Sequence, residues 1–236
     1  MQTKVFFVFD YLSVFEKYES LVQEVDRAIG RVQETHPDQI RCRQGCSDCC
    51  SAVFDLTLVE AFYLNAHFHW ELPEEVRLSI TERAETADRQ FYQLKHKLHR
   101  MRLREGKTDQ ELLGYLAEQR VRCPLLNASE GCDLYAFRPI TCRVYGIPTA
   151  IQGKPRICEL SGFESGRTYP TVHLDRINDR LFSLSRYLLG EAGIADPDQK
   201  LNGLVVPVSE ALMTEYDDDF FRLLAKRSLQ DAVVTS

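Results

Sequence analysis

Residues 42–50 read Cys-Arg-Gln-Gly-Cys-Ser-Asp-Cys-Cys, and this cysteine-rich stretch decides how the rest of the chain is interpreted. A second group spans residues 123–158, and the two groups hold all eight cysteines of the protein. Thiolates are soft, negatively charged ligands that suit zinc ions or iron–sulfur clusters. Gly45 and Gly131 fit the tight loops that let neighbouring sulfur atoms converge. The candidate metal ligands are Cys42, Cys46, Cys49, Cys50, Cys123, Cys132, Cys142 and Cys158.

The number of cysteines leaves the number of metal centres open. Four thiolates complete one tetrahedral zinc site or one four-iron cluster, so eight complete two centres, or one centre with reserve thiols. Adjacent side chains start in divergent directions. We therefore expect Cys49 and Cys50 to serve different centres, or one of them to be a buried residue that binds no metal.

Composition narrows the class of protein. The chain has 236 residues, and its hydrophobic fraction of 44% is enough for a buried core without metal. The formal net charge of -6 argues against general affinity for nucleic acid or anionic membranes. The apolar run Val5–Phe9 ends at Asp10 and is too short to span a membrane. We expect a cytoplasmic protein, in which clustered cysteines indicate metal or redox chemistry rather than four disulfides.

Helical periodicity dominates outside the cysteine groups. It predicts a helix over residues 11–36, a second from Thr57 to Trp70 that begins with a capping-box pattern, and a short extended piece over 52–56. A long polar helix opened by Pro73 and a partner over 108–119 predict a helical hairpin insertion at 73–119. Further helices are expected over 172–189 and 209–229, with a lone strand near 203–208. The fold class is mainly α with some α+β character, a single domain over 1–236 in which a helical scaffold holds irregular cysteine-rich loops.

The cysteine pattern resembles a known family. The cysteine-rich first loop is followed by Cys-Pro-Leu-Leu from Cys123, Gly-Cys-x-Leu-Tyr from Gly131, and Arg-Pro-x-x-Cys-Arg from Arg138. In this order the motifs resemble the CxxCxxCC cysteine-cluster family of zinc- or iron-chelating or iron–sulfur-containing proteins, over roughly residues 42–158. All eight of the family's cysteine positions can be matched. One departure is the three-residue gap between Cys42 and Cys46, which puts the role of Cys42 in question.

The resemblance also implies a cofactor. A bacterial flagellin lysine methylase is similar to this family and carries a four-iron cluster, which favours a 4Fe-4S iron–sulfur cluster over zinc here. Methylation itself is not implied by these residues. We expect a metal-binding protein whose cluster serves redox or enzyme-associated chemistry, with a redox or protein partner of unknown identity. The alternative is a zinc-binding structural or metal-chelating module without catalysis.

Two other interpretations of the cysteines compete with this one. The spacing of Cys42, Cys46 and Cys49 is also that of radical S-adenosylmethionine enzymes. Those enzymes need a barrel of alternating strands and helices, which the mostly helical pattern here does not predict. A purely structural zinc knot that uses all eight thiols is the simpler alternative.

Residues close to the cysteines have both functional and structural interpretations. Arg138 and Arg143 could balance thiolate charge or hydrogen-bond to sulfur, or they could be structural, with Pro139 fixing a turn. Tyr135 could donate a hydrogen bond toward the site or anchor the core.

Residues away from the cysteines give weaker signals. Seven basic residues between Arg89 and Lys107 could dock an acidic protein or nucleic acid, but most such faces are simply solvated. His67 and His69 fall on different faces of a helix, which argues against a shared metal. The run Asp217–Asp219 is interpreted as a solvated helix face. No nucleophile motif or phosphate-binding loop stands out.

Overall fold

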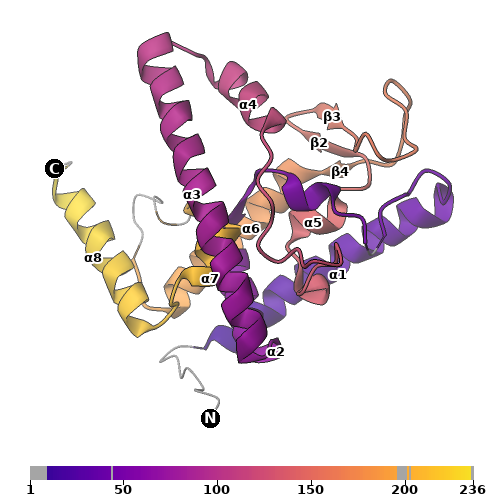
Figure 1. Ribbon diagram of the computed structural model, residues 1–236. Coiled ribbons are helices and arrows are strands. Elements are labelled where there is room, and N and C mark those ends of the chain that lie inside the picture. Colours follow the sequence, from indigo (N-terminus) through magenta and orange to yellow (C-terminus); the bar gives the residue numbers. More distant parts are fainter. Residues whose placement is uncertain (1–9, 44, 196–200, 202, 235–236) are drawn as a thin grey trace.

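The computed structural model describes residues 10–43, 45–195, 201 and 203–234, and it is mainly α-helical with two small sheets (Figure 1). The expected mainly α fold with some β structure is thereby confirmed. The apolar run Val5–Phe9 lies outside the described residues. Of the helices that are described, none has both the length and the apolar character needed to cross a membrane.

The elements follow one another with short connections in the first half of the chain. The helices are α1 (Tyr11–Thr35), α2 (Leu58–Glu71), α3 (Glu74–Glu105), α4 (Asp109–Glu118), α5 (Ile140–Val144), α6 (Leu174–Glu191), α7 (Val208–Met213) and α8 (Asp218–Val234). Two short 3-10 turns, η1 (Asp48–Ser51) and η2 (Tyr135–Phe137), lie in the cysteine groups. The strands are β1 (Asp55–Thr57), β2 (Thr149–Ile151), β3 (Lys154–Arg156), β4 (Val172–His173) and β5 (Val205–Pro207).

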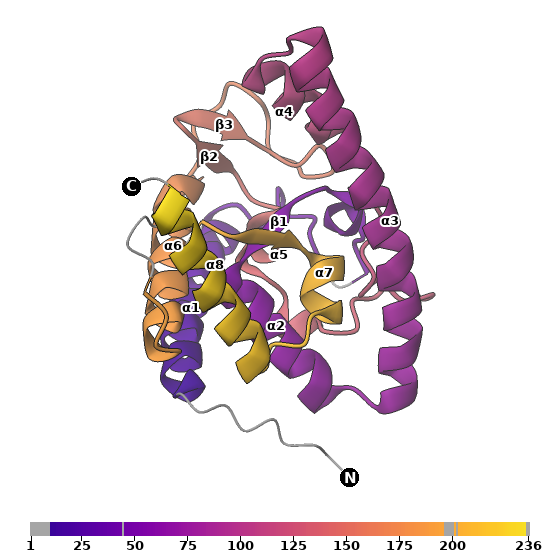
Figure 2. The same cartoon turned by 90° about the vertical axis from the view of Figure 1, so that its left-hand side faces the viewer.

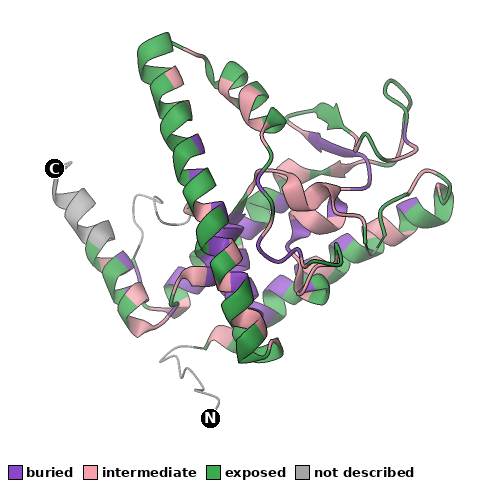
Figure 3. Ribbon diagram, viewed as in Figure 1, coloured by how far each residue is buried: buried purple, intermediate pink, exposed green. Residues whose placement is uncertain are grey.

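Helix α2 is the centre of the core. Every residue from Leu58 to Phe68 is buried, because α1, α6 and α7 pack around it (Figures 2 and 3). A helix that is apolar on all sides belongs in a protein interior. Its polar exceptions have specific roles, since Glu60 binds backbone groups at two helix starts and Asn65 binds the end of α7. The predicted start at Thr57 is confirmed, and its hydroxyl and N–H both donate to Glu60.

Helices α3 and α4 form where the hairpin was predicted, but α3 packs mainly on a different element. The buried seam from Ile80 to Leu94 lies on the body of the protein, and α7 is the most extensive partner of α3. Helix α4 has no buried residue and touches only the far part of α3. The reason is length, because ten residues of α4 can cover only the end of a helix of 32 residues. Figure 3 shows that end of α3 exposed on most of its surface.

The helix predicted over 209–229 is two helices, α7 and α8, and this part of the prediction was wrong. The side-chain amide of Asn65 donates to the carbonyls of Ala211 and Thr214, at 2.9 and 3.0 Å, which satisfies the end of α7. Asp217 then accepts from the N–H of Phe220 at 2.8 Å and caps α8. The aspartate run therefore starts a helix rather than forming only a solvated face.

The two sheets hold the cysteine loops to the helices. The predicted extended piece and the predicted strand pair as β1 and β5, with Leu56 opposite Val206. In the second sheet, β2 pairs antiparallel with β3 and parallel with β4. This second sheet connects the segment that carries Cys158 to the start of α6.

Candidate metal centre

The first cysteine loop is a series of tight turns. The N–H of Cys46 donates to the carbonyl of Arg43 at 2.9 Å, and the N–H of Cys50 donates to Ser47 at 3.0 Å as η1 begins. Gly45 has a φ of 91°, a left-handed conformation that a residue with a side chain rarely adopts. The loop prediction for Gly45 is confirmed, and the turns present several thiols within a few residues.

The second cysteine group returns directly to the first. The N–H of Cys123 donates to the carbonyl of Cys50 at 2.6 Å, and the N–H of Val121 donates to Ser51 at 3.0 Å. A β-bridge between Ala52 and Arg120 continues this pairing. The chain thus leaves after the first group, forms α3 and α4, and comes back beside the same residues.

The loop after Cys123 is held by a β-bridge, hydrogen bonds and an ion pair. Leu126 and Cys132 form a β-bridge, and the N–H of Asp133 donates to Leu125 at 2.9 Å. The Arg83 side chain, on α3, donates to the carbonyl of Pro124 at 2.7 Å and forms an ion pair with Asp133 at 2.9 Å. These contacts fix the shape of the loop.

Gly131, which was assigned to a tight loop, does not have a positive φ; Glu130 does, at 57°. Space is tight at Gly131, because a Cβ there would lie 3.3 Å from the Asn127 side chain. Asn127 in turn accepts from the N–H groups of Ser129 and Gly131, both at 3.0 Å. The side chain of Asn127 thereby closes the turn.

Two residues that were not among the predicted site residues lie against the segments that carry Cys142 and Cys42. Glu60 accepts from the N–H of Ile140 at 3.1 Å, at the start of the short helix α5 that carries Cys142. Gly146 lies against Cys42, and a Cβ there would be only 2.3 Å from the Cβ of Cys42. The capping-box pattern revealed Glu60, but its contact with α5 depends on tertiary structure. A lone glycine such as Gly146 gives no sequence signal.

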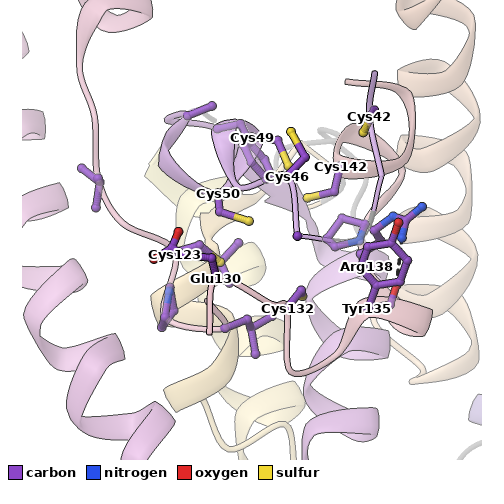
Figure 4. A pocket seen from close by; sticks show the side chains of 18 of the residues that line it. Cys42, Cys46, Cys49, Cys50, Cys123, Glu130, Cys132, Tyr135, Arg138 and Cys142 are labelled. Atoms are coloured by element: carbon purple, nitrogen blue, oxygen red, sulfur yellow. Dashed lines mark hydrogen bonds between the residues drawn. The ribbon is translucent and has the colours of Figure 1, made fainter. Parts of the chain in front are cut away.

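Seven of the eight cysteines line one pocket (Figure 4). Figure 4 shows the thiols of the first loop and Cys142 on one side, with Cys123 and Cys132 opposite. The pocket has a volume of about 60 Å³, several times the space that one water needs. Its other walls are mainly apolar, with Phe54, Phe91 and Val208 among them. The two cysteine groups therefore meet in space, as expected.

The eight thiols do not all lie in one place. Within the described part of the chain, no three histidine, cysteine, aspartate or glutamate side chains are arranged so that they could hold a metal ion. Cys158 stands outside the pocket, where its thiol faces Asp48 at 3.8 Å. Cys49 and Cys50 both lie on η1 and both line the pocket, so their assignment to different centres stays a prediction.

Burial and mutual contact disfavour loss of the thiol protons. Burial raises the pKa of Cys123 to about 12 and that of Cys132 to about 11. The neighbouring thiol of Cys142 raises the pKa of Cys49 to about 12, and the thiol of Cys49 raises the pKa of Cys50. Crowded thiols such as these lose their protons readily only if a cation replaces them.

The two arginines near the site have different roles. Arg143 donates to the carbonyl of Arg138 at 3.0 Å and to Asp26 at 2.9 Å, so it holds η2 against α1 as a structural residue. Arg138 lines the pocket and lies over the Tyr135 ring, 3.8 Å from its centroid. Its charge favours the thiolate forms of Cys42 and Cys132, against the effect of burial.

Replacing Arg143 should therefore affect mainly stability, whereas replacing Arg138 should affect mainly metal binding. Arg143→Gln should lower the free energy of unfolding by about 2 kcal/mol, because a largely buried guanidinium loses its charged hydrogen bonds. Arg138→Gln should change stability little but weaken metal binding by about tenfold, as its charge no longer offsets the thiolates. Thermal unfolding and metal titration of both variants provide the check. Equal effects of the two changes on metal binding would contradict this division.

The other candidates from the sequence are placed away from the pocket. His67 is buried and stacks on Phe137, with ring centroids 3.8 Å apart, whereas His69 is exposed. In the basic run, Arg102 and Lys107 pair with Asp109 and Glu111 of α4. Part of that charge is therefore balanced within the hairpin.

Comparisons with known proteins point to one family. The sequence profile of the CxxCxxCC family, described as "Putative zinc- or iron-chelating domain", matches residues 41–159, just over half of the chain. Searches of curated proteins and of solved structures found no match to the chain. The matched residues include both cysteine groups and the hairpin between them.

Proposed function

This chain belongs to the CxxCxxCC family of zinc- or iron-chelating domains, and from that premise we propose that its thiol pocket holds an iron–sulfur cluster of the four-iron type. The observation that carries the proposal is the gathering of seven thiols, from three separate segments, around one pocket with apolar walls. The resemblance to flagellin lysine methylase favours iron. A cytoplasmic location would keep these thiols reduced.

The chemistry of the donor groups fits such a cluster. The lining residues include seven cysteines and no histidine, and their one carboxylate, Glu130, pairs with Arg122 at 2.9 Å. Sulfur donors select iron–sulfur clusters or zinc over magnesium or calcium, which prefer oxygen. Four thiols satisfy one centre, and the pocket offers more than four.

The residues that line the pocket would have different roles. Four of the seven thiols that line the pocket would hold the cluster. A bound cluster would supply one-electron transfer, or a reactive iron, to a redox or protein partner. Phe54, Phe91 and Val208 would limit access of water, and Arg138 would offset the negative charge.

Anaerobic purification followed by visible absorbance and analysis of iron, sulfide and zinc tests the proposal. We expect a coloured protein with iron and sulfide in equal amounts, close to four of each per chain. A colourless protein with stoichiometric zinc would defeat it. That result would support the alternative function, a zinc-binding module without electron transfer.

As the pH falls, the cysteine loops should lose their metal and open before the helical core unfolds. Each thiol that binds metal must release its proton, so metal affinity should fall by up to about tenfold per pH unit for each proton released. The raised pKa values of Cys123 and Cys132 extend this competition through the whole neutral range. Hydrogen exchange at falling pH, or with a chelator, should show the backbone near Cys46 and Cys132 opening before α2. Uniform opening of the protein would contradict this order.

A further inference from the structure

The second half of α3 carries a stripe of exposed side chains on the side away from the core. This part of the helix extends from the body of the protein beside α4 (Figures 1 and 2). The stripe consists of four side chains that are spaced by four, three and four residues and so share one face: Tyr92, His96, His99 and Leu103. Tyr92 is 63% exposed and Leu103 is 68% exposed, whereas Leu94 on the opposite side is buried. The ring centroids of Tyr92 and His96 lie 4.3 Å apart, so these two rings form a continuous surface.

Basic side chains flank this outer stripe. The spacing of the stripe is that of the a and d positions of a coiled coil, in which the e and g positions lie on either side. In this register Lys95 and Arg102 occupy g positions and Arg100 occupies an e position. Arg102 pairs with Asp109 of α4. Among the residues that the structure describes, Lys95 and Arg100 form no ion pair, so their charges are available to a partner.

The charge of this region is opposite to that of the rest of the protein. Residues 89–118 contain seven basic and four acidic residues, a formal charge of +3, although the whole chain is -6. The remainder of the chain is therefore -9. A local positive face on an acidic protein attracts and orients an acidic partner. Nucleic acid is a poorer match, because the acidic remainder repels phosphate groups.

We propose that the outer stripe of α3 docks an acidic amphipathic helix of a partner protein. Apolar side chains of that helix would pack on Tyr92 and Leu103, and its glutamate or aspartate side chains would pair with Lys95 and Arg100. The stripe is roughly 16 Å long, which corresponds to about three turns of the partner helix. The pairing of acidic with basic flanking positions sets the choice of partner.

The docking face is close to the thiol pocket. Phe91 lines that pocket, and the next residue, Tyr92, begins the outer stripe. A helix is about 10 Å wide, so a partner on the stripe would lie within about one helix diameter of the pocket wall. This position suits electron exchange with a cluster in the pocket. That consequence rests on the proposed function, whereas the docking itself does not.

Binding of a synthetic peptide to the full chain tests the docking face. The probe is a peptide of about three heptads with Leu at a and d and Glu at e and g, and repulsion between its glutamates disfavours self-association. A control peptide carries Lys at e and g. Fluorescence anisotropy should show that the Glu peptide binds, more weakly as salt is added, and that the Lys peptide does not. The measurement needs no iron, so it remains decisive if the pocket holds zinc.

Charge variants locate the binding on α3. The double variant Lys95→Gln with Arg100→Gln should weaken binding of the Glu peptide about tenfold, because both partner carboxylates lose their cations. The matched control removes two exposed charges from β3, with Lys154→Gln and Arg156→Gln. That control should change the affinity by less than about twofold. Equal weakening by the two double variants would overturn the proposal, because it would show an effect of net charge alone.

A leucine variant tests the apolar part of the interface. Leu103→Ala should weaken binding of the Glu peptide severalfold, because the peptide loses an apolar contact. Leu113→Ala on α4 is the matched control, since Leu113 is 60% exposed but lies outside the stripe, and it should have no effect. Both leucines are exposed, so neither change should unfold the protein. Similar affinities for the two variants would contradict docking on the stripe.

Three further results would overturn the proposal. The first is failure of the Glu peptide to bind the wild-type chain. The second is tighter binding of a single-stranded oligonucleotide that is lost in Lys95→Gln with Arg100→Gln, which would assign the face to nucleic acid. The third is a salt-sensitive dimer in gel filtration that is lost in the same double variant, which would assign the face to a second copy of this chain.

Discussion

Cys132→Ser should abolish stable metal binding in the pocket. Cys132 lies opposite the first cysteine loop and is one of the thiols that line the pocket. Loss of a direct ligand should reduce affinity by more than the roughly 100-fold that loss of a supporting hydrogen bond can cost. Metal content after gel filtration and the visible spectrum measure the effect.

The variant should remain folded, which makes its metal content interpretable. The loop that carries Cys132 is fixed by Arg83, Asp133 and the bridge to Leu126, none of which involves metal. Circular dichroism should therefore retain the helical signal. Cys158→Ser is the matched control, because that thiol lies outside the pocket. Near-normal iron in Cys132→Ser, with a normal spectrum, would show that the pocket thiols do not share a metal.

Glu60→Ala should be strongly destabilising. Glu60 is 3% exposed and accepts from the N–H groups of Thr57 and Ile140, at 3.3 and 3.1 Å. Truncation leaves both donors buried without partners, at about 1–3 kcal/mol each, and removes packed atoms as well. We expect the free energy of unfolding to fall by roughly 3–5 kcal/mol. Urea denaturation measures it, and a loss below about 1 kcal/mol would contradict this role.

Glu60 should also give the stability a defined pH dependence. Burial raises the pKa of Glu60 above its usual range, although the hydrogen bonds from Ile140 and Thr57 oppose the shift. Because the folded state binds this proton more tightly than the unfolded state does, protonation of Glu60 stabilises the fold. That contribution is complete at pH values below the ordinary pKa of a carboxyl group, and it is lost as the pH rises through the raised pKa. Glu60→Gln should remove this part of the pH profile while keeping one acceptor oxygen. An unchanged profile in the variant would refute the assignment.

The helices could be predicted from the sequence because their signals are local. The capping boxes at Thr57 and Thr108 each span about one turn of helix, and the apolar residues of 11–36 recur every three or four residues. The break between α7 and α8 could not be predicted in this way. It depends on Asn65, a residue about 150 positions earlier in the chain, whose amide reaches the end of α7. The choice of α7 over α4 as the main partner of α3 is likewise a tertiary effect.

The site could be predicted only as a set of thiols. The spacing indicated which cysteines form the site and implied that the two groups would meet. The backbone hydrogen bond from the N–H of Cys123 to the carbonyl of Cys50 shows that they do. The spacing could not show that Cys158 lies outside the pocket, because its position beside the Asp48 carboxylate depends on tertiary structure. It also could not distinguish Arg138, just before α5, from Arg143, within α5, because their roles differ in what their side chains contact.

Anomalous diffraction from crystals of the anaerobically purified protein, recorded at the iron edge, tests the shared metal centre most directly. The account predicts one strong iron peak inside the pocket, bonded to sulfur atoms from both residues 42–50 and residues 123–142. Pocket thiols without a metal between them, or metal bound by only one of the two cysteine groups, would contradict it.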